Sequence, residues 1–274
     1  ETRWQGALRA LLLMQQAYLA GRPDEGLTVA SEHLEQTPRF AALRTLYAGL
    51  MLDDRSRPER LARDRARSQL KTALSHSPQL LSARLSLAKL LLQDEKPVQA
   101  HELLTALPEG VERTWQTELL RHRVLKTRGF VVEAAAALAE AQKLGPTACP
   151  TLESLVDFRR EQQDDRGALV AAQALASCNP YSERWADALL DGGRLDEAQH
   201  EFERLLQLEP ESQPWLRGLS RVLLARRDLG PATTTLLKLQ ALSPRSVNLY
   251  TDLANLYVER GQPETALQHI KQGL

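Results

Sequence analysis

Residues 248–274, with the sequence NLYTDLANLYVERGQPETALQHIKQGL, contain the pattern that decides the fold. They hold two short amphipathic runs, 249–260 and 264–274, joined by a Gly-Gln-Pro turn. Ala266 falls where the second run must come close to the first, and Ile270 lies one helical turn later on the same face. The stretch therefore predicts an antiparallel pair of short helices.

The same couplet, a small residue followed four places later by an apolar one, recurs along the chain. The series is Ala66/Leu70, Ala100/Leu104, Ala134/Leu138, Ala168/Ala172, Ala198/Phe202, Ala232/Leu236 and Ala266/Ile270, with a looser copy at Gly26/Ala30. Successive alanines are 34 residues apart, except for 30 residues between Ala168 and Ala198. A period of this length predicts an all-α superhelical solenoid of about eight stacked antiparallel helical hairpins.

Prolines and turn residues divide the chain into these hairpins. A proline follows each of several helical runs and blocks its continuation: Pro38, Pro78, Pro146, Pro180, Pro210 and Pro244. The predicted hairpins cover residues 7–40, 41–80, 81–112, 113–148, 149–178, 179–212, 213–246 and 247–274. Stacked repeats share one core, so we expect a single continuous solenoid over residues 1–274, as a fragment of a longer protein.

The hairpins resemble the tetratricopeptide repeat, whose template is Trp-x2-Leu-Gly-x2-Tyr, then Ala-x3-Phe, then Pro. The last hairpin matches at Tyr250, Leu253, Ala254, Tyr257, Ala266 and Ile270. The sixth matches at Trp185, Ala186, Leu189, Gly193, Ala198, Phe202 and Pro210, and the seventh at Leu216, Leu219, Ser220, Leu223, Ala232, Leu236 and Pro244. The resemblance covers essentially the whole chain. It implies that peptides, extended segments or folded proteins are the ligands.

Three hairpins depart from this pattern. The second has extra residues at 53–59, which predict a longer loop between its helices. The fourth has Arg121 and His122 where Leu and Gly are expected. The fifth has a polar turn, predicted at residues 164–167, between its two helices. The spacing of 30 residues between Ala168 and Ala198 predicts a tightening or kink near Pro180.

Composition argues against several classes of function. Hydrophobic residues make up 43% of the chain and charged residues 26%, as in an ordinary folded protein. Lys and Arg (35) balance Asp and Glu (35), so no net field attracts nucleic acid, and we expect no nucleic-acid partner. No uninterrupted apolar run reaches about 18 residues, so we expect no direct membrane span.

No motif for catalysis or cofactor binding is recognisable. The six histidines, His33, His76, His101, His122, His200 and His269, form no HExxH or His-x3-His pair, and we expect ordinary surface or groove histidines. There is no phosphate-binding glycine loop and no nucleophile elbow. The sequence therefore predicts a segment that is not an enzyme and has no cofactor or metal site.

A basic stripe and a pair of cysteines each allow two interpretations. Arg60, Arg63, Arg67 and Lys71 share one helix face, either as a contact for an acidic partner or as a solvated back with Leu61, Leu70 and Leu74 facing inward. Cys149 and Cys178 lie at the open end of one hairpin, either as free thiols or as a disulfide that closes a loop of about 30 residues. A disulfide would imply an oxidising compartment. With an Arg-, Leu- and Ala-rich composition typical of GC-rich bacteria, this leans toward a bacterial periplasm or cell envelope over the cytoplasm.

The resemblance implies that the first helix of each hairpin lines a concave groove. In the fifth and sixth hairpins this selects an acidic middle, Glu153, Asp157, Glu161, Glu183, Asp187 and Asp191, together with Arg160. The fourth and seventh hairpins contribute Arg123, Lys126, Arg217 and Arg221, and the first contributes Leu8, Leu11, Tyr18 and Leu19. We expect a partner with a basic segment to dock against the acidic middle. The alternative is that neighbouring helices pair these charges, for example Asp187 with Arg184 or Arg221.

These features predict a non-catalytic scaffold or adaptor that binds a peptide or protein partner in its groove. The family variant that binds chaperone C-terminal carboxylates is disfavoured, because only Asn255 falls on a place of its Lys/Asn/Arg clamp. The alternative is a positioning arm of a larger enzyme, a secretion or cell-envelope assembly protein, or a peptide-sensing regulator.

Overall fold

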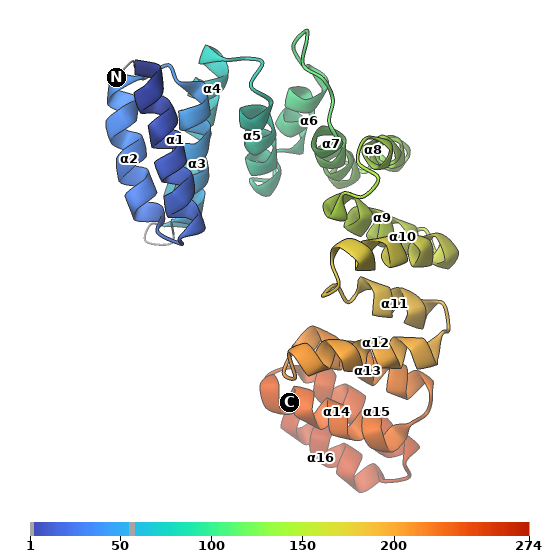
Figure 1. Cartoon of the computed structure of the whole chain (residues 1–274). Coiled ribbons are helices and arrows are strands. Elements are labelled where there is room, and N and C mark those ends of the chain that lie inside the picture. Colours follow the sequence, from blue (N-terminus) through green and yellow to red (C-terminus); the bar gives the residue numbers. More distant parts are fainter. Residues whose placement is uncertain (1–2, 55–57, 274) are drawn as a thin grey trace. The chain divides into compact units, whose positions relative to one another are not determined.

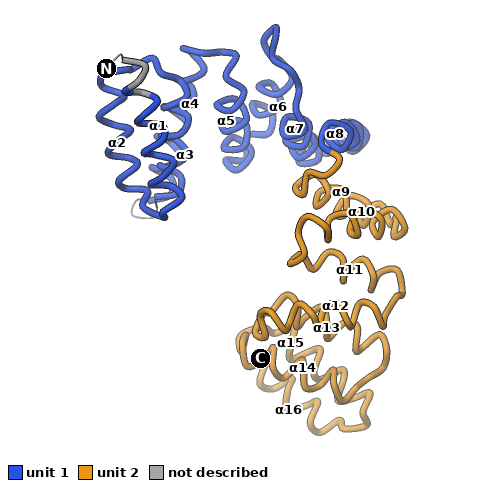
Figure 2. Tube along the Cα trace, in the orientation of Figure 1, with its two compact units in different colours: residues 1–145 blue, residues 146–274 orange. Residues whose placement is uncertain are grey.

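The computed structural model describes residues 3–54 and 58–273, which form sixteen helices and no strand (Figure 1). The described chain divides into two compact units, residues 1–145 (unit 1) and residues 146–274 (unit 2) (Figure 2). Consecutive helices pair into eight hairpins, so the predicted all-α architecture of repeated hairpins is confirmed over the described residues. We call the odd-numbered member of each pair the first helix and the even-numbered member the second helix.

Each unit contains four of these hairpins. The helices of unit 1 are α1 (Arg3–Leu19), α2 (Pro23–Gln36), α3 (Ala41–Asp53), α4 (Glu59–His76), α5 (Leu81–Gln93), α6 (Pro97–Thr105), α7 (Trp115–Thr127) and α8 (Val131–Leu144). The helices of unit 2 are α9 (Cys149–Glu161), α10 (Asp165–Cys178), α11 (Arg184–Asp191), α12 (Leu195–Leu208), α13 (Gln213–Ala225), α14 (Leu229–Leu242), α15 (Val247–Glu259) and α16 (Pro263–Gly273).

The periodic alanines are the contact points of the hairpins. All seven of the series are at most 2% exposed, from Ala66 on α4 to Ala266 on α16. Their apolar partners are buried as well, except for Ile270, which is 47% exposed because no described helix follows α16. Most of these helices have 14 residues or fewer and would be marginal alone, so packing between hairpins must stabilise them.

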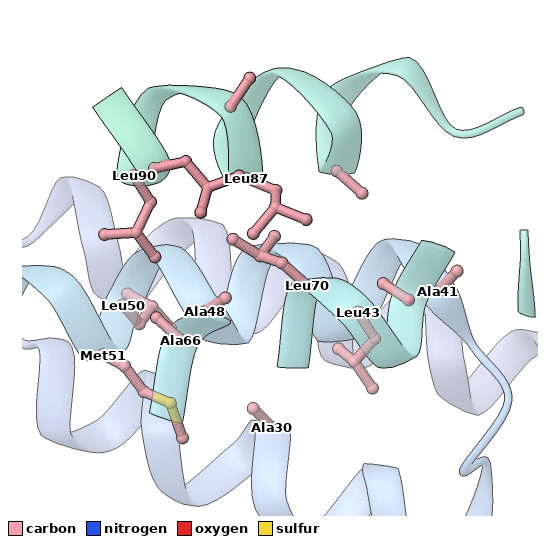
Figure 3. Close-up of a cluster of buried hydrophobic side chains, with 14 of the residues drawn as sticks. Ala30, Ala41, Leu43, Ala48, Leu50, Met51, Ala66, Leu70, Leu87 and Leu90 are labelled. Carbon is pink, nitrogen blue, oxygen red and sulfur yellow. The ribbon is translucent and has the colours of Figure 1, made fainter. Parts of the chain in front are cut away.

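The largest core cluster lies in unit 1 and joins successive hairpins. Figure 3 shows Leu43 and Leu50 of α3 grouped with Leu70 of α4 and with Leu87 and Leu90 of α5. Each is at most 3% exposed. Burying one such leucine stabilises the fold by roughly 1.5–3 kcal/mol before the entropy of ordering the chain is counted.

A left-handed residue recurs in the turn between the two helices of most hairpins. Glycine occupies it where φ is 68–79°, at Gly21, Gly129, Gly193 and Gly261. Glu95, Gln163 and Arg227 take the same place with φ of 58–62°, which is unfavourable for a residue with a Cβ. The turn of the fifth hairpin is therefore at Gln163. Its predicted place at residues 164–167 was too late, because residues 165–167 already belong to α10.

The fourth hairpin is regular despite its unusual residues. His122 is only 2% exposed, and its Nδ1 lies 2.9 Å from the carbonyl oxygen of Ala134 on α8. The expectation of surface or groove histidines is wrong for His122, because this hydrogen bond satisfies the ring inside the hairpin. Arg121 forms an ion pair with the buried carboxylate of Glu118, and Arg113 forms a second ion pair with the same carboxylate.

The other two departures have different outcomes. The repeat of 30 residues is accommodated by α11, which has eight residues where most first helices have 13. The predicted long loop lies between Asp53 and Glu59, and residues 55–57 are outside the described part of the chain.

Candidate partner-binding face

The first helices lie closest to one another within each unit. In unit 1, α1 contacts α3, α3 contacts α5 and α5 contacts α7, and in unit 2 α11 contacts α13. No pair of second helices in the described chain makes a comparable contact. The closer spacing places α1, α3, α5 and α7 on the inner side of the stack in unit 1, and α11 and α13 on the inner side in unit 2. We call the surface formed by α9, α11, α13 and α15 the first-helix face of unit 2.

The predicted groove residues map onto the first helices as follows. Glu153, Asp157, Arg160 and Glu161 lie on α9, Glu183 directly precedes α11, Asp187 and Asp191 lie on α11, Arg217 and Arg221 lie on α13, and Asn255 lies on α15. Arg123 and Lys126 lie on α7 in unit 1. The structure therefore brings one part of the predicted set together on one face of unit 2.

An ion-pair ladder, made of Arg160, Asp187, Asp191 and Arg221, crosses this face. Arg160 donates from Nε to Oδ2 of Asp191 at 2.7 Å, and its Nη1 lies 3.5 Å from Oδ2 of Asp187. From the other side, Arg221 reaches Oδ1 of Asp187 at 3.1 Å and Oδ1 of Asp191 at 3.4 Å. The ladder thus ties α9 to α11 and α11 to α13.

A second cross-helix pair joins α9 to the start of α11. Arg184 donates to both oxygens of Asp157, from Nε at 3.0 Å and from Nη2 at 2.9 Å. This bidentate hydrogen bonding raises the pKa of the Arg184 guanidinium above its ordinary value. Nearby, Asn179 donates from Nδ2 to Oε1 of Glu153 at 3.4 Å.

The predicted acidic middle therefore has its own counter-ions. Asp157, Asp187 and Asp191 each accept from an arginine of a neighbouring first helix. Of the two pairings considered for Asp187, the one with Arg221 is present, whereas Arg184 pairs with Asp157. A basic segment that docked here would compete with these arginines.

Asp187 is the most enclosed carboxylate of the ladder, with 17% of its side chain exposed. Burial raises the pKa of the Asp187 carboxyl above its ordinary value, and this exceeds the lowering by Arg160 and Arg221. Because the folded-state pKa is raised, Asp187 favours the native state most at low pH, and this contribution is lost as pH rises through the folded pKa.

An open pocket of about 370 Å³ adjoins the ladder between the start of α11 and α13. Its lining comes from Glu183, Asp187, Gln213, Pro214, Arg217, Gly218 and Arg221. Gly218 carries no Cβ because the ring of Phe202 occupies that space, with Cε1 only 2.1 Å from where a Cβ would be. The pocket thus combines two carboxylates and two guanidinium groups over a closely packed floor.

Unit 1 carries the predicted apolar end and a second pocket. Leu8, Tyr18 and Leu19 on α1 are 57%, 51% and 78% exposed, whereas Leu11 packs against the core. A pocket of about 670 Å³ lies between α3, α4 and α5, with Tyr18 at its edge. Its wall includes residues 53, 54 and 59, which flank the part of the chain that is not described, so no site is assigned to it.

The basic stripe on α4 is partly neutralised. Arg67 pairs with Asp64 and with Asp94, and Arg63 pairs with Glu59 and lies 3.7 Å from Asp94. Of the leucines expected to face inward, Leu70 is fully buried but Leu61 is 42% exposed. The expectation for Leu61 is wrong, because Leu61 lies nine residues before Leu70 and therefore on the opposite side of α4 from the buried leucine.

The two cysteines meet at the open end of the fifth hairpin. Cys149 is the first residue of α9 and Cys178 the last residue of α10, and the structure joins them in a disulfide with Cα atoms 5.9 Å apart. This separation lies within the range of ordinary disulfides, which ends at about 7 Å.

Several side chains of this face were not selected from the sequence. Arg184 was considered only as a partner for Asp187, and Gln213, Pro214 and Gly218 were not singled out. A usable signal was present in the repeat itself. Residue 183 precedes residue 217 by 34 positions, as residue 187 precedes residue 221, so acids in one repeat are followed by bases at equivalent places in the next.

None of the described helices combines the length and the apolar character that crossing a membrane requires. Within the same residues, no three His, Cys, Asp or Glu side chains group in a way that could hold a metal ion.

Comparison with known proteins places the chain near the tetratricopeptide repeats. Residues 183–247 match the tetratricopeptide repeat family model. No curated protein sequence matches the chain significantly. A chain of the APC/C Cut9–Hcn1 hetero-tetramer matches with a TM-score of 0.70 at 16% identity, over 89% of this chain and 48% of that one.

Two other solved structures have the same fold. A tetratricopeptide repeat protein from Parabacteroides merdae has a TM-score of 0.60 at 16% identity, over 85% of this chain and 91% of that one. The human IFIT1 dimer with m7Gppp-AAAA has a TM-score of 0.56 at 13% identity, over 92% of this chain and 67% of that one. At such identities the likeness concerns the fold alone. One structure contains a protein complex and another a capped oligonucleotide, so the fold by itself does not select the class of partner.

Proposed function

We propose that this chain, whose residues 183–247 are tetratricopeptide repeats, is a non-catalytic scaffold that binds a protein or peptide partner on the first-helix face of unit 2. The fold is consistent with a protein-interaction scaffold. The observation that carries the proposal is the ion-pair ladder, which holds side chains of three first helices in fixed positions beside an open pocket. Such preorganisation lowers the entropy lost when a partner binds.

The charges of this face favour a protein partner. The described first helices of unit 2 present acids and bases side by side, so a uniformly charged polymer would be repelled by the charges of its own sign. A basic segment remains compatible with Glu153 and Glu183, which are not ion-paired within 4.0 Å to any described residue, but it is no longer the only chemistry that fits. Protein segments that carry both signs fit this pattern best.

Site-specific photo-crosslinking tests the proposal. A photoreactive residue is placed at Asn255, exposed on α15, or at Gln207, exposed on the second helix α12. After illumination in extracts of the source cells, we expect a discrete crosslinked protein from Asn255 and little or none from Gln207. Both positions are exposed, so burial of the photoreactive group does not distinguish them. Equal products from both positions, or products from Gln207 alone, would contradict the assignment of the binding face.

A further inference from the structure

Next to the ion-pair ladder, two residues of opposite charge do not form an ion pair. Glu183 and Arg217 lie one helical turn before Asp187 and Arg221 on the same faces of their elements. Asp187 and Arg221 form an ion pair at 3.1 Å. If the two elements kept the same relative position one turn earlier, Glu183 and Arg217 would form an ion pair as well. No such ion pair is present among the described residues, and both side chains line the pocket of about 370 Å³. We call this unclosed pair the open rung.

The short repeat explains why the rung is open. α9 and α13 each begin four residues before the position equivalent to Glu183, at Cys149 and Gln213. α11 begins only at Arg184, so it lacks the turn that would stand opposite the first turn of α13. The pocket occupies this space, since Gln213 and Pro214 of that first turn form part of its wall.

Both charges of the open rung are available. The guanidinium nearest to Glu183 in sequence belongs to Arg184, which is already bound to both oxygens of Asp157. Arg217 acts electrostatically on Asp252 of α15, whose pKa burial raises and Arg217 lowers. Within the described residues, however, no carboxylate lies within 4.0 Å of Arg217. Among the described residues, therefore, neither side chain forms an ion pair within 4.0 Å, and the charge that Arg217 influences is that of Asp252.

We propose that the open rung binds a pair of opposite charges on a peptide partner, with a cationic side chain against Glu183 and a carboxylate against Arg217. A ligand with a cation alone would meet Arg217 and Arg221 in the same pocket, and a ligand with an anion alone would meet Glu183 and Asp187. Only a ligand that carries both charges can place a cation against Glu183 and a carboxylate against Arg217 at the same time. This inference deepens the proposed function and rests on it.

The test uses blocked dipeptides and the full chain labelled with 15N. Acetyl-Lys-Glu-amide and acetyl-Glu-Lys-amide are titrated against acetyl-Lys-Lys-amide, acetyl-Glu-Glu-amide and acetyl-Gln-Gln-amide, with the amide signals of Gly218 and Arg217 as reporters. We expect at least one mixed dipeptide to bind about threefold or more tightly than every other probe, as an exposed charge contact allows. E183Q and R217Q should each remove this preference.

Matched variants and a competing polymer make the outcome decisive. E35Q and R166Q remove exposed charges on the second helices α2 and α10 and should leave the preference unchanged. Equal binding of all five dipeptides, or a preference that survives in both E183Q and R217Q, overturns the open rung. Tighter binding of oligo(A) than of either mixed dipeptide, abolished by R217Q, overturns it in favour of nucleic acid. If crosslinking from Asn255 succeeds while the dipeptides show no preference, the binding face stands and only the open rung fails.

Discussion

Replacing Gly218 with alanine is expected to destabilise the chain by about 1–3 kcal/mol. The added Cβ would lie 2.1 Å from Cε1 and 2.2 Å from Cζ of Phe202. Phe202 is fully buried on α12, so its ring has no free space into which to move. Urea unfolding of the purified variant measures the loss as a lower midpoint with an unchanged slope.

Gly230 provides the matched control for this substitution. It also lies in a helix, α14, but nothing stands within 4 Å of where its Cβ would be. Gly230→Ala should be close to neutral, because the gain in helix propensity is offset by the restriction that a Cβ meets before Pro231. Replacing the Phe202 ring with the smaller leucine side chain, by Phe202→Leu in the Gly218→Ala variant, should recover part of the lost stability. Equal stability of Gly218→Ala and Gly230→Ala would contradict the close packing of the Phe202 ring on α12 against Gly218 on α13.

Removing the disulfide between Cys149 and Cys178 is the second substitution with a large expected effect. The bond joins residues 29 apart, and the chain-entropy model assigns about 3–4 kcal/mol to closing a loop of that length. Cys149→Ser with Cys178→Ser should lower the free energy of unfolding by this amount. The bond holds the start of α9 to the end of α10, so loosening it should also weaken the neighbouring contact between Asn179 and Glu153.

Reductant supplies the control within one experiment. Dithiothreitol should lower the stability of the wild-type chain to that of the double variant and leave the double variant unchanged. Equal stability of the two proteins without reductant would show that the bond does not form or does not constrain the unfolded chain.

The fold was predictable from the sequence because its determinants are local and periodic. Ala198 and its counterparts mark the closest approach of two helices, and a small residue is required there in every repeat. The turn residues recur at the same spacing, so Gly193 and Gly261 identify equivalent turns. Local rules failed where one residue found a partner in another helix, as His122 did with Ala134.

The candidate site was predictable only in part. Template positions selected Asp157, Asp187 and Arg221, and all three lie on the first-helix face of unit 2. Which carboxylate pairs with which guanidinium depends on helix offsets that sequence spacing does not determine. The sequence therefore left Arg184 and Arg221 as alternative partners of Asp187, and the structure pairs Arg221 with Asp187 and Arg184 with Asp157. The pocket lies where α11, which begins only at Arg184, has no turn opposite the first turn of α13. That Glu183 lines this pocket could not be predicted, because sequence spacing does not give the relative positions of the two helices.

The central claim is that the first-helix face of unit 2 carries paired charges with one open rung. Hydrogen exchange of the arginine Nε–H groups, measured by NMR on the full chain, tests it most directly. Arg160 and Arg184 donate from Nε to Asp191 and Asp157, so their Nε–H groups should exchange slowly. The Nε–H of Arg217 should exchange as fast as that of exposed Arg166. An Arg217 group as protected as that of Arg160 would contradict the open rung, and fast exchange in all four would contradict the ladder itself.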